Sequence, residues 1–306
     1  MNNKPFKSGF VSIIGKPNVG KSTFLNTLFG EKLFITSSKP QTTRNRIQGI
    51  YTTDTEQIVF IDTPGIHKSN NKLGEVMNEF ALSAMEGIDL ILLLVDASLP
   101  FSPSDELILE ELRKNKIPTL LVINKVDKVL NKAKLEDLIN KYKASYPFKG
   151  GITISAKENF NIDKLKQMIV DNLEEGPMYY PDDQVLDLPE RFVVSELIRE
   201  KVLQLTKEEV PHCVAVTIEA FKQDSKNPNL ININATLVCE RQSQKSILIG
   251  HNGDMIKKIG TEARKDIVKF LKKKVYLELF VKVEQNWRNN KFYLKQFGYN
   301  MDDYKK

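Results

Sequence analysis

The sequence predicts an α/β fold, in which a mostly parallel sheet with flanking helices is followed by a smaller α+β domain. The chain opens with a strand, a glycine-rich loop and a helix, alternates between strands and helices to about residue 172, and ends in a β-rich, basic region. Such alternation is typical of a parallel sheet covered by helices on both faces. We expect one domain over residues 1–175, a linker over 176–188 and a second domain over 189–306.

The composition is that of an ordinary globular protein, with 306 residues, 41% hydrophobic and 27% charged. The two cysteines, Cys213 and Cys239, lie far apart in apolar runs, so we expect neither a disulfide framework nor a cysteine metal site. The longest apolar run, Leu90–Val95, is far shorter than the roughly 20 residues that span a bilayer, and the start lacks a signal-peptide core. We expect a cytoplasmic monomer without a transmembrane segment.

Positive charge is concentrated at the end of the chain. The net charge is +6, yet residues 241–306 alone hold 16 Lys and Arg against 7 Asp and Glu. A strongly basic segment favours binding to a polyanion. We therefore expect the second domain to bind one.

The first strand, residues 10–14, runs into a loop of the pattern G-x-x-x-x-G-K-[ST] and then a helix over 23–29. The loop and the residue after it are Gly15, Lys16, Pro17, Asn18, Val19, Gly20, Lys21, Ser22 and Thr23. Glycines allow backbone N–H groups to converge on an anion at a helix N-terminus, and the lysine reaches the β- and γ-phosphates. The loop predicts a nucleotide site, with Ser22 as a Mg²⁺ ligand.

A polar loop over residues 37–44 and two strands over 47–51 and 57–61 follow. Small polar residues fill the loop, so we expect it to move, and Thr43 is the hydroxyl we expect to close on Mg²⁺ and the γ-phosphate, with Thr42 as the alternative. The second strand ends in Asp62, Thr63, Pro64 and Gly65. An aspartate at the carboxyl end of a strand beside a phosphate loop is positioned to hold Mg²⁺ through water.

The rest of the first domain continues the alternation. We expect helices over residues 74–85, 104–114 and 162–172 and strands over 89–96, 119–123 and 151–154. The strand at 119–123 is followed by Asn124, Lys125, Val126 and Asp127, and the strand at 151–154 by Ser155, Ala156 and Lys157. Ligands bind at the carboxyl ends of strands in sheets of this kind.

The Asn124–Asp127 motif identifies the base. A carboxylate at Asp127 can accept hydrogen bonds from N1–H and the exocyclic amine of guanine, donors that adenine does not present there. With adenine the acceptor would be left unpaired at a cost of a few kcal/mol. The sequence therefore predicts GTP as the ligand.

These motifs, in this order, resemble those of the translation-factor-related GTPases. The resemblance implies that Asn18, Lys21, Thr43, Asp62 and Gly65 form the catalytic set and that the chain hydrolyses GTP with Mg²⁺. Related enzymes use a glutamine to orient the attacking water, whereas the residue after Gly65 here is Ile66, which cannot polarise water. With Asn18 in the glycine-rich loop, the chain resembles a subgroup of GTPases that use K⁺ beside the phosphates. We expect slow hydrolysis without a partner.

The second domain begins with a helix after Pro189, and two strands over 212–220 and 230–239 follow it. Next come Gly250, His251, Asn252 and Gly253 within an apolar frame, then Lys257, Lys258 and Arg264, a strand over 275–283 and a short helix over 289–296. The G-x-x-G loop resembles that of KH domains, in which it clamps about four nucleotides of single-stranded nucleic acid. The order α-β-β-α-β resembles the bacterial type II KH domain, and we expect these residues to bind RNA.

The whole chain resembles the Era-type family of bacterial GTPases. The resemblance rests on the motifs above together with Pro40–Arg44, Asp62–His67 and a segment containing Trp287 and Arg288. It implies binding of the 3′ end of 16S ribosomal RNA by the KH domain, a role in assembly of the small (30S) ribosomal subunit, and peripheral association with the inner face of the plasma membrane.

Two other functions are compatible with the same motifs. The chain could be an RNA-binding module whose nucleotide domain only stabilises the structure, and the dependence of RNA affinity on the bound nucleotide distinguishes this from a switch. GTP-dependent tRNA modification is the other alternative, and the sequence disfavours it because no second catalytic group of residues is visible.

Overall fold

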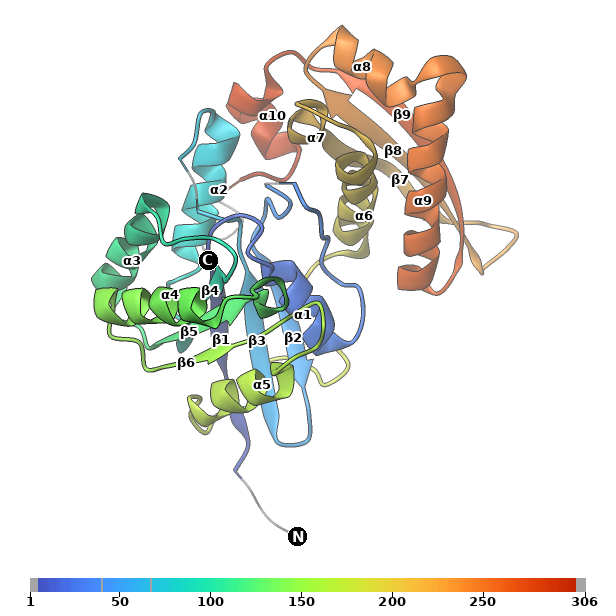
Figure 1. Cartoon of the computed structure of the whole chain (residues 1–306). Helices are drawn as coiled ribbons and strands as arrows, with labels where there is room; N and C mark the ends of the chain where they lie inside the picture. The colour runs from blue at the N-terminus through green and yellow to red at the C-terminus, as the bar shows by residue number, and fades with distance from the viewer. Residues whose placement is uncertain (1–4, 40, 67, 301–306) are drawn as a thin grey trace. The chain divides into compact units, whose positions relative to one another are not determined.

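The computed structural model describes residues 5–39, 41–66 and 68–300. Pro40 and His67, which belong to the motifs above, lie outside the described residues. The chain divides into two compact units (Figure 1). The first unit comprises Met1–Phe34, Thr43–Ser69 and Met77–Asp187, and the second comprises Ile35–Thr42, Asn70–Val76 and Leu188–Lys306.

A six-stranded sheet forms the centre of the first unit, in the order β2-β3-β1-β4-β5-β6. All pairs are parallel except β2 with β3. Every residue of β4 is buried, as expected for an apolar strand between two parallel neighbours. The strands are β1 (Lys7–Ile14), β2 (Ile47–Thr52), β3 (Glu56–Asp62), β4 (Leu90–Asp96), β5 (Thr119–Asn124) and β6 (Gly150–Thr153).

Helices cover both faces of this sheet, which confirms the predicted fold class. Side chains of α3 and α4 pack with Ile61 on one face, whereas Phe24 of α1 contacts Phe60 edge-on on the other. Sequence analysis missed α4, whose buried Leu138 and Tyr142 pack on the core with the partly buried Leu135 and Ile139. The helices are α1 (Lys21–Phe29), α2 (Lys72–Ser83), α3 (Pro103–Asn115), α4 (Lys132–Ser145) and α5 (Ile162–Asp171).

Residues 176–187, expected from composition to form a linker, run along the first unit. The buried side chain of Gln57 accepts hydrogen bonds from the backbone N–H groups of Tyr179 and Tyr180 (2.7 and 3.0 Å). The backbone N–H of Ile50, in edge strand β2, donates to the carbonyl of Val185 (2.8 Å). The segment thus supplies hydrogen-bond partners to an edge that would otherwise be open.

The second unit contains a three-stranded sheet in the order β7-β8-β9, with β8 antiparallel to β7 and parallel to β9. Helices α6 and α9 pack against each other and each contacts this sheet. The observed order adds α7 and α8 to the predicted α-β-β-α-β order. The elements are α6 (Glu190–Leu205), α7 (Val210–Cys213), β7 (Ala215–Gln223), β8 (Leu230–Cys239), α8 (Gln242–Ile249), α9 (Asp254–Leu271), β9 (Lys274–Val283) and α10 (Lys291–Gln296).

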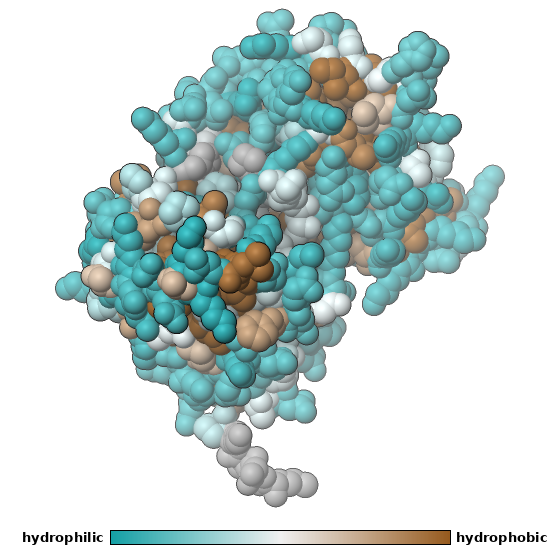
Figure 2. Space-filling model, in the orientation of Figure 1, coloured by the Kyte–Doolittle hydropathy of each residue, from teal (hydrophilic) through white to brown (hydrophobic). Residues whose placement is uncertain are grey.

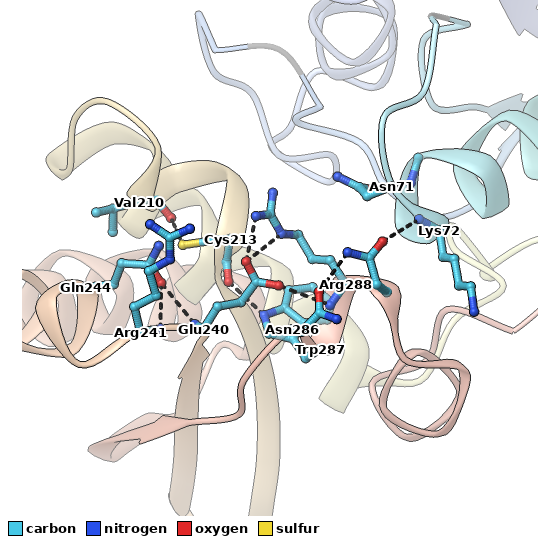
Figure 3. Close-up of polar contacts among 12 residues, drawn as sticks. Asn71, Lys72, Val210, Cys213, Glu240, Arg241, Gln244, Asn286, Trp287 and Arg288 are labelled. Atoms are coloured by element: carbon cyan, nitrogen blue, oxygen red, sulfur yellow. Dashed lines mark hydrogen bonds and ion pairs between the residues drawn. The ribbon is translucent and has the colours of Figure 1, made fainter.

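Trp287 anchors the end of this unit (Figure 3). Its ring is fully buried, and its indole N–H donates to the carbonyl of Cys213 (2.8 Å). Next to it, the Arg288 guanidinium donates to one carboxylate oxygen of Glu240 through Nη2 (2.6 Å) and Nε (3.1 Å). The indole needs a partner when it is buried, and the carbonyl provides one. Trp287 is therefore a packing residue.

Within residues 5–39, 41–66 and 68–300, no helix is long and apolar enough to cross a membrane. The face drawn in Figure 2 is mostly hydrophilic, with apolar side chains in separate small groups.

Candidate functional site

The glycine-rich loop connects β1 to α1 at the carboxyl edge of the sheet. Gly20 has φ 103°, a left-handed conformation, and a Cβ there would lie 2.3 Å from Nδ2 of Asn124. Only glycine fits such an approach. The Nζ of Lys21 donates to the carbonyls of Gly15 (3.3 Å) and Lys16 (3.2 Å) within the loop. Burial lowers the pKa of Lys21 to about 8, although the charge of Asp62 acts in the opposite sense.

The next two residues, Ser22 and Thr23, lie in the first turn of helix α1, and Ser22 contacts two side chains from other segments. Its hydroxyl donates to Oδ2 of Asp62 (2.9 Å) and lies 3.1 Å from the hydroxyl of Thr43, which itself donates to the same carboxylate oxygen (3.2 Å). The hydroxyl of Thr42 instead donates to the carbonyl of Lys39 (2.8 Å). Of the two threonines, Thr43 is therefore the one whose side chain lies beside Ser22 and Asp62.

The carboxyl of Asp62 is fully buried, and only its Oδ2 accepts the hydrogen bonds from Ser22 and Thr43. Its Oδ1 has no hydrogen-bond partner in the part of the chain that the structure describes. Burial raises the pKa of Asp62, against the lowering effects of Lys21 and of the bonds from Ser22 and Thr43. A buried carboxylate oxygen without a donor, flanked by two hydroxyls, is a donor set that a hard cation such as Mg²⁺ prefers.

The residues after Asp62 bring the backbone close to the glycine-rich loop. A Cβ on Gly65 would lie 2.4 Å from the backbone nitrogen of Pro17. The hydroxyl of Thr63 donates to the carbonyl of Ile13 (2.9 Å), which fixes the strand end. Pro64 is buried and Ile66 is half-buried. The loop therefore requires glycine at position 65 for space.

Asn124 connects three of the predicted motifs. Its Nδ2 donates to the carbonyl of Val19 (2.8 Å), and its Oδ1 accepts from the backbone N–H of Ala156 (3.0 Å). Asp127, one residue beyond Val126, is exposed, and its Oδ1 accepts a hydrogen bond from the hydroxyl of Ser155 (2.5 Å). Lys157 is also exposed and forms an ion pair with Glu158 (3.1 Å). Thus the loops after β1, β5 and β6 lie together at one edge of the sheet.

Two acidic residues that sequence analysis did not select support these loops. Asp96 pairs with Nζ of Lys125 (2.6 Å), which also donates to the carbonyl of Asn18. Asp105, buried in the first turn of α3, pairs with Nζ of Lys16 (2.7 Å). A position at the carboxyl end of β4 was the one available signal for Asp96. Asp105 lies in a helix far from any motif and gave none.

The exposed loop of the second unit lies between α8 and α9. Gly250 and Gly253 have φ values of 76° and 83°, and a Cβ on Gly250 would lie 2.7 Å from the backbone nitrogen of Met255. His251 and Asn252, between the glycines, are exposed. Lys257 and Lys258 follow on the exposed side of α9, whereas Nε of Arg264 donates to the carbonyl of Val275 (2.6 Å). The exposed loop residues and the positive charge of the two lysines favour binding to a polyanion.

The fold and these two groups of residues define a P-loop GTPase with an added KH domain. Comparisons agree, because a family model described as 50S ribosome-binding GTPase matches residues 10–125 and a KH domain model matches residues 209–288. The crystal structure of a tyrosine-to-alanine variant of Aquifex aeolicus Era bound to GDP·AlF4⁻ is similar over 96% of this chain and 99% of that chain, with 40% identity and a TM-score of 0.93. A second structure, Era in complex with MgGDPNP and nucleotides 1506–1542 of 16S ribosomal RNA, matches with the same identity, coverage and TM-score.

The chain therefore belongs to the Era family of GTPases. This confirms the predicted GTPase activity and the predicted pair of domains.

We predict that Ser155→Ala weakens the binding of guanine nucleotides. The variant removes the hydroxyl that donates to Asp127, and a hydrogen bond to a charged group contributes about 1.5–3 kcal/mol, so affinity for a fluorescent GDP analogue should fall about 10- to 100-fold. Ser145→Ala is the matched control, because that hydroxyl donates to the carbonyl of Lys141 in its own helix. Equal affinity of both variants and the wild type would exclude this role for Ser155.

Proposed function

We propose that this chain is a GTP-driven switch that binds the 3′ end of 16S ribosomal RNA through its KH domain and assists assembly of the 30S subunit. The observation that carries the proposal is the similarity over nearly the whole chain, both domains included, to Era in complex with nucleotides 1506–1542 of that RNA. Its place of action would be the cytoplasm. Peripheral association with the inner face of the plasma membrane rests on the family resemblance alone.

The RNA site we propose is the loop Gly250–Gly253 with the basic side of α9. Support comes from the positive φ of Gly250 and Gly253, a backbone conformation that other residues rarely adopt, and from the exposed Lys257 and Lys258. Clamping of a short single-stranded segment by such a loop is the usual recognition mode of KH domains. His251 and Asn252 would contact the RNA as loop residues, and Arg264 would add charge.

The nucleotide site we propose has separate groups for the phosphates and the base. Lys21 and the backbone of the glycine-rich loop would bind the phosphates, while Asp127, positioned by Ser155, would accept hydrogen bonds from guanine. Ser22 and Thr43 would hold Mg²⁺ directly and Asp62 through water, which fits the unpartnered Oδ1. Bound Mg²⁺ neutralises charge on the β- and γ-phosphates.

Hydrolysis in this site would proceed without a glutamine. Ile66 is apolar, so it can exclude water from the reaction but cannot orient it. Asn18, whose backbone is left-handed (φ 63°), would help to hold K⁺ beside the phosphates, and its backbone carbonyl is fixed by Lys125. The chain would then depend on an ion or a partner for rapid turnover.

The test of the switch is the affinity of the full chain for an RNA oligonucleotide spanning nucleotides 1506–1542, measured with GDP and with GDPNP, both with Mg²⁺. We expect tighter binding with GDPNP, by a factor in the usual range of allosteric coupling, about 5- to 150-fold. Identical affinities would defeat the switch. They would leave an RNA-binding module in which the nucleotide domain is structural.

Gly253→Asp should abolish binding of this RNA while leaving GDP binding intact, because it adds a side chain and a negative charge where the phosphate chain would approach. Gly298→Asp is a close control, because Gly298 also lies in the second unit and has φ 82° against 83° for Gly253. Among the described residues other than the chain neighbours, no heavy atom lies within 4 Å of a Cβ added at either position. Retained RNA affinity in Gly253→Asp would shift the contact to another surface.

Hydrolysis by the chain alone should be slow, on the order of 10⁻⁴ to 10⁻² per second, and faster in KCl than in NaCl at equal ionic strength. Phosphate release at saturating GTP measures this. Substitution of Asn18 by Ala should reduce the difference between the salts. Equal rates of the wild type in both salts would remove the potassium role.

A further inference from the structure

A segment from the middle of the GTPase sequence belongs to the second unit. Residues Ile35–Thr42 group with the second unit, and the division falls at the peptide bond between Thr42 and Thr43. The hydroxyl of Thr43 lies beside Ser22 and Asp62 in the first unit. Two consecutive residues of the predicted switch loop are thus held by different parts of the molecule.

Helix α6 binds this segment with charged side chains that are themselves buried. Four charged residues of the helix are almost fully buried. The relative exposures are 7% for Glu196, 1% for Arg199, 0% for Glu200 and 7% for Lys201. Charged residues are almost never buried unless they are paired. Glu196 and Arg199 lie one turn apart and pair through Nε and Nη2 (2.7 and 2.6 Å).

Hydrogen bonds tie both ends of the segment to α6. At one end, the backbone N–H of Thr36 donates to Oε1 of Glu200 (2.8 Å). At the other end, Nη2 of Arg199 donates to the carbonyl of Thr42. Between them, Nζ of Lys39 donates to the carbonyl of Thr206, just after the helix. Three hydrogen bonds therefore hold the segment against α6 and the residue that follows it.

Polar contacts also connect these charged residues of α6 with α9, the helix that follows the G-x-x-G loop. Lys201 donates to Oε2 of Glu200 (2.9 Å) and pairs with Asp266 of α9 (2.6 Å). Helix α9 starts at Asp254, directly after Gly253, the last residue of the G-x-x-G loop. Thr36 is thus joined to α9 by a continuous series of polar contacts, Glu200, Lys201 and Asp266.

A second segment near a nucleotide motif is also held by this unit. Residues Asn70–Val76 group with it, and the backbone N–H of Lys72 donates to Oδ1 of Asn289 (3.1 Å), in the turn that contains Trp287 (Figure 3). Asn71 lies next to it in the same view. The hydrogen bond to Asn289 lies at an exposed position, whereas Ile35–Thr42 forms several hydrogen bonds that are partly buried.

We propose that Arg199, fixed by Glu196, is the positioning residue that links the switch loop to the RNA-binding unit. It holds the carbonyl of Thr42, one peptide bond from the hydroxyl that would meet Mg²⁺ and the γ-phosphate. The inference rests on the proposed function, because it assigns the regulation of that same switch.

The geometry of arginine suits this role. Its planar guanidinium can pair with a carboxylate on one edge and still direct an N–H at a carbonyl, so the direction of the bond to Thr42 is set by Glu196. A movement of Thr43 toward a γ-phosphate must either carry α6 with it or break this bond. Either response changes the second unit, and by linkage RNA binding must change the affinity for the γ-phosphate state by the same factor.

The experiment compares the coupling ratio, the RNA affinity with GDPNP divided by that with GDP, in Arg199→Met and wild-type full-length chains. The reciprocal ratio, GDPNP affinity with and without the 1506–1542 RNA, is measured as well. We expect the wild type to show about 5- to 150-fold coupling and Arg199→Met to fall within about twofold of 1 in both measurements. A merely structural role would weaken RNA binding with both nucleotides and leave the ratio unchanged.

Arg191→Met is the matched control, since Arg191 lies on the same helix and its Nη2 donates to a backbone carbonyl, that of Ile218 in β7 (2.8 Å). It should keep the wild-type ratio. Because Arg199→Met leaves Glu196 buried without its partner, Glu196→Gln/Arg199→Met is made in parallel, which removes both charges. Thermal unfolding shows which of the two variants folds normally, and the coupling ratio of that variant tests the proposal.

Two failures are distinguishable. If the wild type itself shows no coupling, the proposed switch fails and this inference fails with it. If the wild type is coupled and the folded Arg199 variant keeps its ratio, only the inference is overturned, and the signal passes elsewhere.

Discussion

The nucleotide-binding edge of the sheet depends on one side chain, that of Asn124. Its amide is almost fully buried, and it donates to the carbonyl of Val19 and accepts from the N–H of Ala156. A neutral amide carries a donor and an acceptor on one planar group, so it can join two loops at a fixed spacing without burying a charge. Asn124 is the last residue of β5, where it pairs with Asp96 of β4, and the sheet therefore fixes its position. Through these hydrogen bonds, Asn124 fixes the positions of the loops after β1, β5 and β6 relative to one another.

Much of the first unit could be predicted because its strands are apolar runs that end in polar motifs. Residues 89–96 and 119–123 were predicted nearly to their bounds, since buried parallel strands are apolar on both faces. Helix α4 was missed although Leu135, Leu138, Ile139 and Tyr142 follow the i, i+3, i+4, i+7 spacing of an apolar stripe, so its sequence did carry the signal. The course of residues 176–187 was not predictable, because it depends on hydrogen bonds to Gln57, more than 100 residues away in the sequence.

In the candidate sites, too, some residues could be predicted from the sequence and others could not. Motif spacing named Gly15–Ser22, Asp62, Asn124 and Asp127, but it could not decide between Thr42 and Thr43, because that depends on which hydroxyl turns toward Ser22. For the segment of α6, the sequence predicted a helix and nothing more. The buried charges of that helix could not be found from its sequence, since Glu and Arg at this spacing normally face solvent.

The position of Trp287 has a practical consequence for optical studies of the molecule. It is the one tryptophan of the 306 residues, it is fully enclosed, and the turn that contains it also holds Asn289, which accepts from Lys72. Indole fluorescence shifts to longer wavelength when water reaches the ring. The native chain thus carries an intrinsic fluorophore in its second unit, beside a segment that follows a nucleotide motif, and stopped-flow emission can follow this region without any attached dye.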